Sequence, residues 1–168
     1  FDNSNDFKEQ KYSVISEILN AIGKTGNEND LDKISSHILL YSGQDTALLV
    51  PAAMSVGRFA LRKIKNEKSV DALKFIVNHS KDIPALRNCA FAFWRTGDRT
   101  LLEKASEEIY TLAESEDAQT RMWAYNALGR LKNNLFLMYT LESFNSENDW
   151  RVKVNMLNSF TNFELDSI

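Results

Sequence analysis

The segment ALGRLKN, residues 127–133, is the clearest copy of a phrase that recurs along the whole chain. Further copies are AIGKTGN from Ala21, ALRKIKN from Ala60 and AFWRTGD from Ala92, and a degenerate copy, SFTNFE, starts at Ser159. The first residues of successive copies are 39, 32, 35 and 32 positions apart, a mean of about 34.5. This period accommodates two helices and two turns, so the sequence predicts a repeat protein.

Each copy has the composition of a helix end. We expect its cation to lie in the last helical turn, and the Asn or Asp that follows is typical of a helix terminus. Three residues before each copy the side chain is mostly small, which favours a close approach of neighbouring helices. These positions are Ile18, Gly57, Cys89, Ala124 and Met156.

The rest of the chain favours helices over strands. Only two prolines and six glycines interrupt it, strand-like alternation is nowhere sustained, and each phrase is followed by a second apolar segment with helical spacing, such as Leu101, Ala105, Ile109 and Leu112. Pro51 either lies in the first turn of its helix or kinks that helix. We predict an all-α fold, an α-α superhelix of about nine helices, over residues 7–22, 30–41, 46–64, 68–79, 83–95, 99–114, 118–131, 134–145 and 149–163.

Length and charge narrow the class of protein. A chain of 168 residues is expected to form one domain, 1–168, and because it begins at Phe1 we expect it to be part of a longer protein. The net charge of −3 and the pI near 5.5 argue against binding of nucleic acid, which needs clustered cations. No apolar run approaches the length of a membrane span.

The last predicted helix, 149–163, has two apolar flanks. Val152, Met156, Ser159, Phe160 and Phe163 share one side, and Trp150, Val154, Leu157 and Thr161 share the other. Such a helix is sandwiched between neighbours, so we expect a further helix to follow in the parent chain. Asn148 or Asp149 is the predicted N-terminal cap.

Three segments carry a family resemblance: TALLVPAAMSVGRFALRKI at 46–64, TRMWAYNALGRLKN at 120–133 and DWRVKVNMLNSFTNF at 149–163. Together they resemble the HEAT-repeat region that accompanies a cyclophilin-type peptidyl-prolyl isomerase domain in some bacterial envelope proteins. The resemblance implies a HEAT-like solenoid and points to the cell envelope or periplasm, with the cytoplasm left open. No segment resembles the isomerase domain itself, so no catalytic residue is carried over.

The reactive side chains give no recognisable active site. His37 and His79 lack a metal-binding companion at helical spacing and are expected at helix ends or on the surface. Cys89 lies in an apolar run and is expected to be a small buried filler rather than a nucleophile. We therefore predict no catalytic residue, no metal and no cofactor in this segment.

Two charged features and one aromatic residue are candidates for partner binding. The recurring cations occupy equivalent positions in successive repeats, and equivalent positions in stacked repeats form a row. They either complement helix dipoles or form a positive edge that binds an acidic partner. These cations are Lys24, Lys63, Arg95 and Arg130. Trp94 replaces a glycine of other copies, so it is either core packing or an exposed aromatic anchor. Glu103, Glu107 and Glu114 share a helical face that is either solvated or a contact for a basic partner.

The function expected from these features is non-catalytic protein binding. A HEAT-like domain would bind a protein or peptide, and by the resemblance that partner is an isomerase domain of the same chain or one of its clients. The alternative is a HEAT-like DNA alkylation-damage glycosylase or another nucleic-acid-binding solenoid, suggested by Arg121, Trp123, Tyr125 and Trp150 on stacked helices.

Overall fold

The computed structural model describes residues 3–40 and 46–162, and the chain is all-α within these ranges, as predicted. The described part contains ten α-helices and one 3₁₀ helix, η1. Their bounds are α1 Asn3–Thr25, α2 Glu28–Leu39, η1 Thr46–Leu48, α3 Leu49–Leu61, α4 Glu67–His79, α5 Ile83–Thr96, α6 Arg99–Glu103, α7 Ser106–Ala113, α8 Ala118–Gly129, α9 Asn134–Ser146 and α10 Trp150–Phe160.

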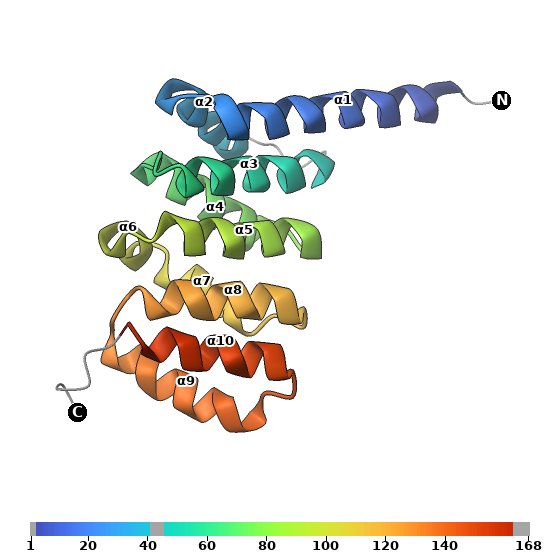
Figure 1. Cartoon of the computed structure of the whole chain (residues 1–168). Helices are drawn as coiled ribbons and strands as arrows, with labels where there is room; N and C mark the ends of the chain where they lie inside the picture. Colours follow the sequence, from blue (N-terminus) through green and yellow to red (C-terminus); the bar gives the residue numbers. More distant parts are fainter. Residues whose placement is uncertain (1–2, 41–45, 163–168) are drawn as a thin grey trace.

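The helices form two layers (Figure 1). In the first layer α1, α3, α5, α8 and α10 each pack on the next, and all of them run from right to left in the view. In the second layer α2 packs on α4 and α4 contacts α6 and α7, while α9 contacts α8 and α10. The buried side chains form a single apolar core along the stack, with Phe59, Phe93 and Leu128 fully buried.

The recurring phrase forms the corner between the two layers. Its closing Asn or Asp does not end the first helix, as the sequence suggested, but caps the helix that follows. Asn27 and Asn66 cap α2 and α4, and Asp98 and Asn133 cap α6 and α9, each accepting a hydrogen bond from a backbone N–H of the first turn. The repeat is therefore defined by a helix end and the next helix start together.

The predicted helix 46–64 is divided into η1 and α3. Pro51 is the third residue of α3 and lies in its first turn, where a missing backbone N–H costs no intrahelical hydrogen bond. The first-turn alternative is therefore the correct one.

The predicted helix 99–114 is broken into α6 and α7 at Lys104 and Ala105, where the backbone of Ala105 has φ −120° and ψ 17°. The carbonyl oxygen of Lys104 instead accepts a hydrogen bond of 2.7 Å from Lys74 Nζ of α4. Ala105 at this break and Ile109 and Leu112 after it are buried, whereas Leu101 before it is half-buried, so the apolar pattern predicted most of the buried side but not the interruption.

Candidate interaction surfaces

The four predicted edge cations lie where the first-layer helices end. Lys24 is in the last turn of α1 and Arg95 in the last turn of α5, whereas Arg130 is the C-cap of α8. Lys63 lies just beyond the C-cap of α3, with a positive φ of 66°, so the prediction that every one of these cations lies inside the last turn is wrong. Lys24, Lys63 and Arg130 are exposed, and Arg95 is half-buried.

Trp94 and Arg95 contact each other. The guanidinium carbon of Arg95 lies 3.8 Å from the centre of the Trp94 ring and 5.3 Å from the centre of the Phe91 ring. Trp94 is half-buried and packs against the core. One ring face of the predicted aromatic anchor is thus covered by one of the predicted edge cations.

Other cations, for which the sequence predicted no contact, join neighbouring repeats. Arg58 donates a hydrogen bond of 2.7 Å to Oδ1 of Asn20, and Arg62 donates one of 2.7 Å to the Gly26 carbonyl. Lys65 donates one of 2.7 Å to the Thr96 carbonyl. Their positions within or beside the recurring phrase were a usable signal, because a residue at a repeat corner is close to the next repeat.

Arginine–carboxylate pairs join the later first-layer helices. Arg87 of α5 donates two hydrogen bonds to Asp117, from Nε to Oδ2 at 3.0 Å and from Nη2 to Oδ1 at 2.8 Å. Asp117 also caps α8 by accepting a hydrogen bond of 2.8 Å from Thr120 N. The hydrogen bonds from Arg87 are the largest cause that lowers the pKa of Asp117, to about 2.

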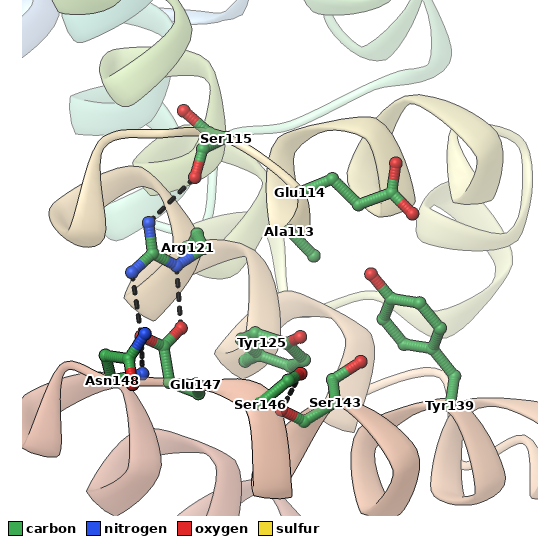
Figure 2. A pocket seen from close by; sticks show the side chains of 10 residues that line it. All are labelled: Ala113, Glu114, Ser115, Arg121, Tyr125, Tyr139, Ser143, Ser146, Glu147 and Asn148. Atoms are coloured by element: carbon green, nitrogen blue, oxygen red, sulfur yellow. Dashed lines mark hydrogen bonds and ion pairs between the residues drawn. The ribbon is translucent and has the colours of Figure 1, made fainter.

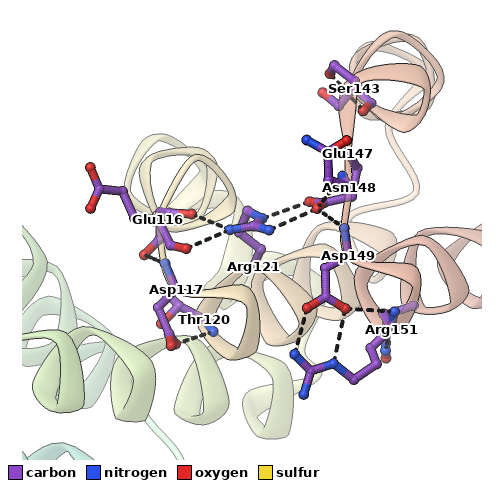
Figure 3. A network of polar contacts seen from close by, with 12 residues as sticks. Glu116, Asp117, Thr120, Arg121, Ser143, Glu147, Asn148, Asp149 and Arg151 are labelled. Carbon is purple, nitrogen blue, oxygen red and sulfur yellow. Dashed lines mark hydrogen bonds and ion pairs between the residues drawn. The ribbon is translucent and has the colours of Figure 1, made fainter.

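A second pair joins α8 to the segment before α10 (Figure 3). Arg121 donates to both carboxylate oxygens of Glu147, at 2.7 and 2.8 Å, and to the carbonyl oxygens of Ser115 and Glu116. Burial alone would raise the pKa of Glu147, but the hydrogen bonds from Arg121 and from the Asp149 amide lower it overall. Asp149 itself caps α10, and its pKa is lowered to about 2 by Arg151.

A polar pocket of about 400 Å³ lies beside this second pair (Figure 2). Arg121 and Glu147 line it together with Tyr125 and Tyr139, whose ring centres are 6.2 Å apart. Burial raises the pKa of both tyrosines, so their hydroxyl groups are held in the neutral form. Because Arg121 and Glu147 bond to each other, the pocket presents mainly hydroxyl groups and the carboxylate of Glu114 to a ligand.

The four residues behind the nucleic-acid alternative do not come together. Arg121 and Tyr125 line the polar pocket, whereas Trp123 packs on Phe91 of α5 with ring centres 5.2 Å apart. Trp150 is at the start of α10 and is exposed. The structure therefore gives these side chains three different environments rather than one site.

The last two described helices carry exposed apolar side chains. On α10 Trp150, Val154 and Leu157 are exposed, with 71% of Trp150 accessible. On α9 Leu135, Met138 and Leu141 are exposed as well. Val152, Met156 and Ser159 on the opposite side of α10 are buried, so only one of the two predicted flanks is covered by described residues.

The remaining predicted residues lie where the sequence placed them. His37 and His79 are exposed in the last turns of α2 and α4, and Cys89 is fully buried, which raises the pKa of its thiol. Glu103, Glu107 and Glu114 are exposed, but the prediction that they share one helical face is wrong, because Glu103 lies in α6 and Glu107 in α7, with the break at Lys104 and Ala105 between them. Among the described residues there is no cluster of three or more metal-ligating side chains, and none of the described helices is long and apolar enough to span a membrane.

Comparison with known proteins gave no match to a protein-family model, to a curated protein or to a solved structure. The resemblance to HEAT repeats therefore rests on the residues quoted above.

Proposed function

We propose that this chain is a non-catalytic helical-repeat domain that binds another protein through the exposed side chains of α9 and α10. The observation that carries the proposal is the exposure of six large apolar side chains on these two adjacent helices. Large apolar side chains gathered on the exposed faces of neighbouring helices are a feature of interaction sites. An aromatic residue such as Trp150 is also the type most often found at the energetic centre of an interface.

The resemblance suggests which partner to try first. A cyclophilin-type isomerase domain of the parent protein, or an unfolded client of that domain, would suit a surface that is apolar. The edge cations Lys24, Lys63 and Arg130 are exposed and would add an orienting charge for an acidic partner. Arg95 contributes less to such an edge, because it lies over Trp94.

The proposal is tested by amide hydrogen exchange of the chain with and without an isolated cyclophilin-type isomerase domain or a reduced, alkylated model polypeptide. We expect slower exchange in α9 and α10 when the partner is present. Val154→Asp should abolish this protection, because a carboxylate in the contact would lose its hydration. The control Asn158→Asp changes an exposed residue beside the apolar stripe and should leave the protection intact. Equal protection in both variants, or none in the wild type, would contradict the proposal.

A further inference from the structure

The two ends of the first layer expose apolar stripes with the same spacing. On α1 the stripe consists of Val14, Ile18, Ala21 and Thr25, and 59% of Val14 is accessible. On α10 it consists of Trp150, Val154, Leu157 and Thr161, the last being its C-cap residue. In both stripes the residues follow the first one at 4, 7 and 11 positions, which places them on one face of a helix. We call these the head stripe, on α1, and the tail stripe, on α10.

Each stripe lies opposite the side by which its helix joins the stack. Gly23 of α1 approaches α3 so closely that an added Cβ would lie 2.7 Å from Ser55 Oγ. Ser159 of α10 approaches α8 in the same way, because a Cβ on Gly129 would lie 2.7 Å from the Ser159 Cβ. Residues 9, 5 and 2 positions before Gly23, or before Ser159, are on the far side of the helix, since each residue turns by about 100°. These are the first three residues of each stripe.

We propose that the tail stripe of one copy packs on the head stripe of a second copy, so that the stack continues from chain to chain. This deepens the proposed function and rests on it, because it names a second copy of the chain, rather than an isomerase domain or its client, as the protein that the α10 surface binds. The contact would continue the packing that joins the five first-layer helices within one chain, which run in the same direction. In a parallel arrangement bulky Trp150 and Leu157 would meet the smaller Val14 and Ala21.

Head and tail are different surfaces, so their contact does not close as a two-fold dimer, and because the stacked helices run in the same direction we expect it to extend into short chains.

The test is sedimentation velocity of the whole chain over a range of concentrations. We expect the weight-average mass to rise from 19.2 kDa to beyond twice that value. The rise should fall between about 1 µM and 1 mM, the affinity range of small interfaces. Ile18→Asp blocks the head and Leu157→Asp blocks the tail, and each variant alone should remain a monomer. Both side chains are about half exposed, 51% in each case, so the fold should survive, which circular dichroism checks.

Mixing the two variants gives the decisive result. Ile18→Asp keeps an intact tail and Leu157→Asp keeps an intact head, so an equimolar mixture should form a 1:1 dimer and nothing larger. Ser13→Asp and Asn158→Asp, on exposed positions outside the stripes, should associate as the wild type does. Two results would overturn the proposal. One is a wild-type monomer at every concentration. The other is a dimer that Ile18→Asp leaves unchanged, because that dimer would join two tails. If the wild type stays monomeric while a partner still protects α10, only this inference fails; if neither occurs, the proposed function fails too.

Discussion

Helices α8 and α10 begin in the same way but end in different surroundings. Asp117 caps α8 and Asp149 caps α10, so Tyr125 in α8 corresponds to Leu157 in α10, eight residues after each cap. Tyr125 is only 2% exposed because α9 covers it, whereas Leu157 is half exposed. The repeat pattern prepares a first-layer helix for a neighbour on each side within its layer, whereas among the described residues α10 contacts only α8 of that layer. The following substitutions test this comparison, from the largest expected effect to the smallest.

The largest contrast is expected between two leucines. Leu128→Ala in α8 empties a fully buried site and should destabilise the chain by about 3 kcal/mol. Leu157→Ala in α10 removes the same atoms from an exposed site and should change stability by about 0.5 kcal/mol or less. Urea unfolding measures both. Similar losses for the two variants would mean that the α10 stripe is covered in solution, and dilution would show whether a second copy covers it.

The pair between Arg121 and Glu147 is expected to matter next. Glu147→Gln leaves a partly buried Arg121 without its charged partner and should destabilise the chain by about 2 kcal/mol. Glu142→Gln on the exposed face of α9 is the control and should have little effect. If both variants unfold at the same urea concentration, the pair between Arg121 and Glu147 adds nothing to the free energy of unfolding.

A smaller, pH-dependent effect is expected at Asp117. The folded-state pKa of Asp117, about 2, is below its ordinary value of 3.8. The stability that the ionised carboxylate adds is therefore present above pH 3.8 and is lost as the pH falls toward 2. Asp117→Asn keeps the capping oxygen but removes the charge that faces Arg87. Allowing for solvent screening, we expect the wild type to be more stable by about 1 kcal/mol at pH 7 and equally stable near pH 2. A difference that does not vary with pH would show that the charge contributes nothing.

The smallest effect is expected at the edge cations. Arg95→Ala removes a cation from the face of Trp94 and should cost about 0.5–1 kcal/mol. Arg130→Ala, the matched change in the next repeat, removes an exposed cation and should cost less. Thermal unfolding of the two variants compares them, and a larger loss for Arg130→Ala would reverse our assignment of their roles.

The repeat phrase was enough to predict the fold class and most helices, because it combines a helix end, a cation and a capping residue. The same phrase placed Lys63 and Arg130 inside helices, although their helices end at Leu61 and Gly129. At both ends the closing carbonyl groups accept hydrogen bonds from backbone N–H groups just beyond the helix, such as those of Ile64 after α3 and Leu131 after α8, and the phrase does not specify these turns. The break at Lys104 involves a distant residue instead, since the Lys104 carbonyl accepts a hydrogen bond from Lys74 of α4.

The candidate surfaces were predicted less completely. The exposed positions of Lys24 and Lys63 follow from their place at a corner, but the covering of Trp94 by Arg95 depends on side-chain geometry. The two apolar flanks of α10 were visible in the sequence, and only the structure shows which flank is covered. Hydrophobic spacing indicates how many neighbours a helix can have, whereas the packed chain shows how many it has.

The most direct test of the open-ended stack is a disulfide between the two stripes. Leu157→Cys in one copy and Ala21→Cys in another should form a cross-linked pair under mild oxidation, because a disulfide requires Cα atoms within about 7 Å. Cys89 is buried and should not interfere. We predict that mass spectrometry of the mixture finds the peptide of residue 157 joined to that of residue 21. Cross-links only between two copies of Leu157→Cys, or none at all, would contradict the account.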